Sequence, residues 1–113
     1  MSRIFKMSFV SVYKLYIAKL ERKGRDVTEL DVVIKWLTGF DKRTLNKHLK
    51  AETTFEDFFD EATINPNAVL ITGTICGVKI QEIEDPLMLK IRYLDKLVDE
   101  LANGKPITKV LRS

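Results

Sequence analysis

Cysteine and histidine are scarce in this chain, which has one of each, Cys76 and His48. A lone cysteine cannot form an intrachain disulfide, and one histidine with one cysteine falls short of the ligand clusters that hold zinc. The sequence therefore predicts neither a disulfide framework nor a metal site. The two glycines of residues 73–77 lack the spacing and the lysine of a phosphate-binding loop, and we expect no cofactor.

Long apolar runs are also missing. The longest stretch without charge, residues 62–78, contains a proline, two asparagines and two glycines, and is too short and too polar to span a bilayer. Near the start of the chain, Lys14 and Lys19 interrupt the apolar residues before they reach the length of a signal peptide. We therefore expect a cytoplasmic protein without a membrane partner, and the single cysteine agrees with a reducing compartment.

The composition is that of a folded domain. Of the 113 residues, 45% are hydrophobic, enough to supply a core, and 31% are charged. No stretch resembles a linker between two folding units. The sequence therefore predicts a single helical domain that spans residues 1–113.

In the first half of the chain, apolar residues recur every three or four positions, which indicates helices. Four such segments follow one another, each opened by a polar residue that can cap a helix. Ser8 is expected to cap a helix that ends at 23, and Thr28 a helix that ends at 38, with Asp31 as the acid of a capping box. Asp41 is expected to cap a helix that ends at 49, and Thr53 a helix that ends at 62.

The second half contains one clear helix and one ambiguous segment. Asp85 and Pro86 open the longest helix, which ends near residue 102, and a last turn or two follows Pro106. Residues 66–76 favour a further helix, whereas their β-branched side chains and Gly73 suit a short hairpin. We therefore predict an all-α fold of five or six short helices in an orthogonal bundle, with a small β-hairpin near residues 70–80 as the alternative.

Charge is unevenly distributed along the chain. Residues 1–26 carry a net charge of +5 and residues 52–62 a net charge of −5, which could steer a charged partner or pair internally. Between them, a helix, a glycine-containing turn and a basic helix have the outline of a helix-turn-helix motif. The residues that would contact phosphates or base edges are Lys42, Arg43, Lys47 and Lys50.

One detail opposes this interpretation. Lys35 stands four residues before Gly39, where a small side chain normally lets the two helices of such a motif cross closely. A helical hairpin with a solvated basic face explains the same pattern. Nucleic-acid binding is therefore an alternative that the sequence does not favour.

A second candidate surface is apolar. Val32 and Trp36 widen the apolar stripe of the 28–38 helix beyond what one helix contact requires, and Phe40 extends it. Such a face could contact a second copy of the chain or a protein partner. Aromatic residues of this kind are, however, commoner in cores.

A third candidate site is polar. Arg92, Asp95 and Asp99 share one stripe of the longest helix, and carboxylates beside an arginine can tune proton affinities or bind a ligand. An enzyme or ligand-binding protein would require them to converge in a pocket with Cys76 or Tyr93. Charges at these spacings are equally typical of a solvated helix face, and the sequence identifies no catalytic residue.

Three stretches carry a family resemblance: MSRIFKMSFVSVYKLYIAKLERKGR, VVIKWLTGF and ITGTICGVKIQEIEDPLMLKIRYLDKLVDELANGKPITKVLR. They are similar to a bacterial family known as domain of unknown function 2200, over essentially the whole chain. The resemblance implies a compact, cytoplasmic, helical protein and brings no reaction or catalytic residues with it. We therefore expect a non-catalytic binding or interaction module, with a nucleic-acid-binding protein as one alternative and a small-ligand-binding protein or enzyme as the other.

Overall fold

Most helices begin and end within a residue or two of the expected capping residues and glycines. The computed structural model describes residues 3–75 and 77–112. Its elements, with η for 3-10 helices, are η1 (Arg3–Lys6), α1 (Phe9–Arg22), α2 (Thr28–Thr38), α3 (Lys42–Lys50), α4 (Phe55–Glu61), η2 (Pro66–Leu70), β1 (Thr74–Ile75), β2 (Val78–Lys79), η3 (Ile80–Glu82), α5 (Pro86–Ala102) and α6 (Ile107–Val110).

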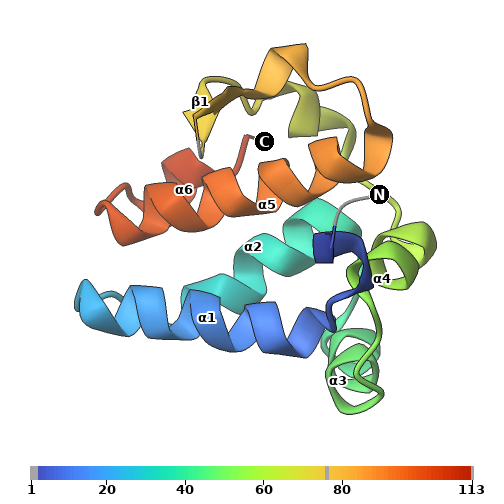
Figure 1. The fold of residues 1–113 in the computed structure, drawn as a ribbon. Helices are drawn as coiled ribbons and strands as arrows, with labels where there is room; N and C mark the ends of the chain where they lie inside the picture. Colours follow the sequence, from blue (N-terminus) through green and yellow to red (C-terminus); the bar gives the residue numbers. More distant parts are fainter. Residues whose placement is uncertain (1–2, 76, 113) are drawn as a thin grey trace.

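The long helices lie along the molecule and the short ones gather at its edges. Figure 1 shows α1, α2 and α5 along the length of the molecule, with α3 and α4 together at one end. The segment from η2 through the hairpin to η3 forms a layer over α5, on the side away from α1. The predicted all-α fold with a small hairpin is confirmed, and no helix in the described ranges is both long and apolar enough to cross a membrane.

Two of the four expected N-caps in the first half are correct and two are displaced. Ser8 and Asp41 cap α1 and α3 as predicted. The expected capping box of Thr28 and Asp31 does not form, because Asp26 accepts the hydrogen bond from the Thr28 N–H and Asp31 accepts one from a tyrosine of α1. At α4 the cap is Thr54 instead of Thr53, one residue later than expected.

The preferred helix over residues 66–76 is wrong, and the alternative hairpin is correct. Helical structure ends after the single 3-10 segment η2, and two-residue strands β1 and β2 pair antiparallel, with Thr74 opposite Lys79. Gly73 has a φ of +101°, a backbone conformation that a helix interior does not contain and that side chains other than glycine rarely adopt. Cys76 lies outside the described residues.

Aromatic side chains fill the core where α1 meets α4. Phe9 stacks on Phe58, with ring centroids 3.8 Å apart and planes 5° apart, and meets Phe55 edge-on. All three are buried. The backbone N–H groups of Phe9 and Phe55 each donate to a carbonyl of the other segment, at 2.6 and 2.9 Å. These two hydrogen bonds join the start of α1 to the start of α4. The short helix α3 therefore lies between the end of α2 and a start of α4 that is anchored to α1.

Candidate functional site

The helix α3 has one buried face and one fully exposed basic face. Leu45 and His48 point into the core, with 1% and 3% of their surface exposed. An α-helix turns by about 100° per residue, so residues 43, 46, 47 and 50 lie on the side of α3 opposite to Leu45 and His48. That outer face consists of Lys42, Arg43, Asn46, Lys47 and Lys50, all exposed, and we call it the basic face of α3.

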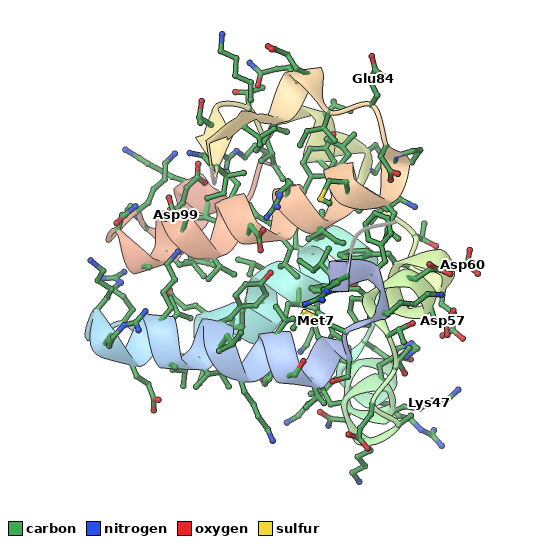
Figure 2. The ribbon with its side chains drawn as sticks, viewed as in Figure 1. Met7, Lys47, Asp57, Asp60, Glu84 and Asp99 are labelled. Carbon is green, nitrogen blue, oxygen red and sulfur yellow. The ribbon has the colours of Figure 1, made fainter. Side chains whose placement is uncertain are left out.

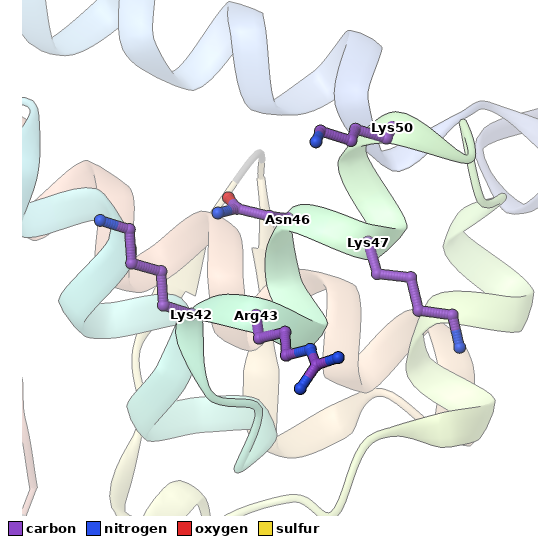
Figure 3. A pocket seen from close by; sticks show the side chains of 5 residues that line it. All are labelled: Lys42, Arg43, Asn46, Lys47 and Lys50. Carbon is purple, nitrogen blue, oxygen red and sulfur yellow. The ribbon is translucent and has the colours of Figure 1, made fainter.

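These five side chains surround an open hollow of about 540 Å³ on the surface of α3. Figure 3 shows them extending from the helix in different directions, with Asn46 between the lysines and the arginine. All the atoms that they offer to a ligand are hydrogen-bond donors except the amide oxygen of Asn46. The hollow is therefore suited to an anionic partner.

The four cations of this face have no ion-pair partner within the described chain. Other basic side chains do: Lys19 lies 3.2 Å from Asp99, and Arg112 forms a bidentate pair with Glu100. In residues 3–75 and 77–112, no acidic side chain comes within ion-pairing distance of Lys42, Arg43, Lys47 or Lys50. An external anion would reduce the repulsion among these four cations.

The turn before α3 fixes the direction in which the basic face points. Gly39 ends α2 with a left-handed φ of +75°, and its N–H donates to the Lys35 carbonyl at 2.9 Å. A Cβ added at Gly39 would lie 3.1 Å from the Thr63 carbonyl oxygen, so a second segment closes against the turn. The three residues 39–41 connect the helices as in a helix-turn-helix, although Lys35 stands where a small residue was expected.

At its N-terminus, α3 is capped by Asp41. The carboxylate of Asp41 accepts a hydrogen bond from the Thr44 N–H at 2.8 Å. This bond to the charged form lowers the pKa of Asp41. The cap therefore stabilises the fold at pH values above the usual carboxyl range and weakens as the pH falls through the lowered pKa.

His48 holds the inner side of α3 against α4. Its Nδ1 lies 3.0 Å from the Thr53 hydroxyl, and its ring packs between Phe40 and Phe58. Its Nε2 lies 2.8 Å from a Glu61 carboxylate oxygen without the alignment of a hydrogen bond. His48 is thus a positioning residue beneath the basic face.

Next to the basic face, α4 presents an acidic one. Glu56, Asp57, Asp60 and Glu61 all lie on this short helix, and Asp57 and Asp60 are exposed. Figure 2 shows Lys47, Asp57 and Asp60 at the same end of the molecule. The negative segment of the sequence therefore lies close to the basic helix in space without neutralising its four exposed cations.

The polar stripe of α5 is joined to α1. Asp95 accepts hydrogen bonds from the Tyr16 hydroxyl and, at 2.7 Å, from Arg92. Asp99 pairs with Lys19 at 3.2 Å. The contacts with Tyr16 and Lys19 cross from α5 to α1, and these partners could not be inferred from the spacing on α5.

Arg92, Asp95 and Asp99 all take part in this polar network. None of the three lines the hollow on α3 or a smaller one of about 180 Å³ between α4 and α5. Tyr93 points into the core, where burial raises its pKa. In the described part of the chain, no three acidic or histidine side chains cluster as metal ligands.

The apolar candidate face is only partly exposed. Val32 is 42% exposed, whereas Trp36 and Phe40 are half-buried against the core. The Phe40 ring contacts His48 and Phe58, so it contributes to the packing beneath α3. Two of the three residues therefore take part in the fold itself.

Asn46 is the member of the site that the sequence reasoning missed. A neutral amide adds nothing to a charge count, so the charge pattern of the sequence does not point to it. The signal that could have found it is position, because residues 42, 46 and 50 recur at the helical spacing of four.

Comparisons with known proteins agree with the fold and assign no activity. A family model described as "Uncharacterized protein conserved in bacteria (DUF2200)" matches residues 3–112. No curated protein matches the chain. The chain is similar to the crystal structure of uncharacterized protein SP1917, with 47% sequence identity and a TM-score of 0.92, over 98% of this chain and 93% of that one. The resemblance seen in the sequence is confirmed.

Proposed function

We propose that this chain, which belongs to the uncharacterised bacterial family DUF2200, is a nucleic-acid-binding module that contacts its partner with the basic face of α3. The observation that carries the proposal is the absence, within the described residues, of any ion-pair partner for four exposed cations on one side of one helix. The proposal thus narrows the expected non-catalytic binding module to one surface, the basic face of α3, and to one class of ligand, nucleic acid.

The arrangement fits a row of phosphates better than a single anion. The hollow on α3 is open, and its cations are spread over the whole length of the helix. An α-helix rises about 1.5 Å per residue, so residues 42 and 50 are separated by about 12 Å along the axis. A nucleic-acid backbone presents several charges over such a distance, and binding to it releases condensed counterions.

Local charge matters more here than the net charge of the chain, which is only +3. The acidic side chains of α4 reduce the potential around α3 and limit the side from which a polyanion can approach. We therefore expect binding of moderate strength. If all four cations contact phosphates, the logarithm of the affinity should fall with the logarithm of the salt concentration with a slope of about −4.

The test is a fluorescence anisotropy titration of a labelled mixed-sequence duplex with the full chain, over a series of salt concentrations. The double variant Lys47→Gln/Lys50→Gln removes two charges from the basic face. The matched control Lys14→Gln/Lys109→Gln removes two charges from exposed lysines of α1 and α6 that also lack an ion pair in the described structure.

We expect the α3 variant to lose about tenfold or more in affinity at low salt and its salt slope to become shallower by about 2, while the control stays close to the wild type. Equal losses in both variants would show that the charge effect is nonspecific and contradict the proposal. So would equal competition by a poly-glutamate peptide, which would indicate an acidic protein partner instead.

A further inference from the structure

We infer that α3 binds in the major groove of duplex DNA and that the Asn46 side chain reads an adenine there. This inference rests on the proposed function and adds to it a form of nucleic acid and a base. It is carried by the position of one neutral amide at the centre of a helix face that otherwise carries only cations.

The helix has the dimensions that a major groove accepts. An α-helix with its side chains is about 10–12 Å wide, close to the groove width of about 12 Å, whereas the minor groove, at about 6 Å, is too narrow. Figure 1 shows α3 at a corner of the molecule, beyond the ends of α1 and α2. Its outer face is therefore not blocked by the long helices.

Asn46 is placed where a base-reading residue belongs. Lys42 precedes it by one helical turn and Lys50 follows it by one turn, so cations lie on both sides of it along the axis. In a groove, such flanking cations can reach the phosphates while the central side chain faces the base edges. A carboxamide combines a donor with an acceptor and matches the N6 and N7 atoms of adenine.

The Asn46 amide is also available to form hydrogen bonds with a ligand. Its side chain has no hydrogen bond within the described chain, whereas the side-chain oxygens of Asn65 and Asp85 accept hydrogen bonds from backbone N–H groups. Asn46 lies within α3 and is exposed. Its function is therefore not accounted for by the capping or packing of the helix.

Other forms of nucleic acid fit this face less well. Single strands are usually bound by stacking their bases on aromatic side chains, and the exposed face of α3 carries none. Double-stranded RNA has a deep, narrow major groove that side chains cannot read. The exposed face of α3 therefore favours duplex DNA.

The experiment is a selection of bound duplexes from a random-sequence pool with the wild-type chain, followed by affinity measurements on the selected sequence. Asn46→Ala removes the amide, and Asn46→Gln retains it on a longer side chain. The selected adenine is also replaced by an analogue in which carbon takes the place of N7. Single-stranded DNA and duplex RNA of the same sequence complete the set.

We expect the selection to return a preferred adenine, against which the wild type discriminates other bases by about ten- to one-hundredfold. Asn46→Ala should lose that preference while keeping affinity for nonspecific duplex and an unchanged salt slope. The adenine analogue should weaken the wild type and leave Asn46→Ala unaffected. Circular dichroism of both variants verifies that α3 remains folded.

Two different results would overturn the inference while leaving the proposed function intact. One is salt-dependent duplex binding without an adenine preference, or with a preference that Asn46→Ala retains. The other is tighter binding of single strands or of duplex RNA. If no nucleic acid binds with salt dependence, the proposed function fails together with the inference, and this result is distinguishable from the first two.

Discussion

The Tyr16 hydroxyl of α1 donates a hydrogen bond to the Asp95 carboxylate of α5. This bond joins the two helices through residues that are 79 positions apart in the sequence. Asp95 also accepts from Arg92, so one carboxylate holds a contact between helices and one within α5. Hydrogen bonds to a charged group contribute more than neutral ones. The polar stripe of α5 is thus part of what keeps α1 in place.

The variant Tyr16→Phe should destabilise the protein without weakening nucleic-acid binding. We expect the free energy of unfolding to fall by about 1.5–3 kcal/mol, the range for a hydrogen bond to a charged acceptor. Urea denaturation followed by circular dichroism measures it. An unchanged midpoint would show that this bond contributes nothing net, and a loss of duplex affinity would show that α1 affects the basic face of α3.

A glycine pair isolates the role of the turn before α3. Gly39→Ala places a side chain at a φ of +75° and 3.1 Å from the Thr63 carbonyl oxygen, whereas Gly24→Ala meets a similar φ of +67° with no atom within 4 Å. The left-handed backbone alone costs about 1–2 kcal/mol for an alanine. We expect Gly39→Ala to cost about 1–3 kcal/mol more than Gly24→Ala because of the close contact. Equal losses would indicate that the Thr63 segment moves aside freely.

Tyr13 should ionise at an unusually high pH. Burial, and then the hydrogen bond that its hydroxyl donates to Asp31, raise the pKa of Tyr13 above the usual 10.0. Because the folded state binds this proton more tightly than the unfolded state, the associated stability is complete below pH 10 and is lost as the pH rises further.

In a spectrophotometric titration of tyrosinate absorbance, Tyr13→Phe should remove a phase that lies above the usual tyrosine range. If the variant instead removes an early phase, the described environment of Tyr13 is incorrect. Stability measurements over the same pH range provide the second readout, since the variant should lose less stability in alkali than the wild type.

Removing negative charge beside α3 should strengthen nucleic-acid binding. Asp57→Asn/Asp60→Asn neutralises two exposed carboxylates at the same end of the molecule as Lys47. We expect a several-fold gain in duplex affinity at low salt that shrinks as salt screens the charges. Glu82→Gln/Glu84→Gln changes the net charge equally, and Figure 2 shows Glu84 far from Lys47, so this control should gain less. Equal gains would mean that only net charge matters.

The elements that sequence reasoning predicted are those whose signals are local. Asp85 and Pro86 open α5 as expected, because a cap and a proline act on their own helix. Thr53 and Thr54 are equally suitable caps in sequence, and the choice depends on His48, whose Nδ1 contacts the Thr53 hydroxyl. In segment 66–76, Gly77 as a helix stop and the helical surroundings favour a helix in sequence, whereas in the structure Gly73, with a φ of +101°, ends helical geometry before β1.

The same distinction holds for the candidate sites. The cations of α3 were found from the sequence because charge and helical spacing are both visible there. The partners of Asp95 and Asp99 on α1 were not, since contacts between residues about eighty positions apart depend on how the helices pack. The lack of ion pairs around the basic face within the described residues likewise depends on how the chain folds, and the sequence alone does not show it.

The joined acidic and basic helices at one end of the molecule have a consequence for motion in solution. Residues 42–61 place positive and negative groups on neighbouring helices, α3 and α4, and so give this end a permanent electric dipole. In the field of any large charged body, such a dipole experiences a torque before contact occurs. If the chain binds a polyanion as proposed, this torque would turn α3 toward it before contact and shorten the search for a productive orientation.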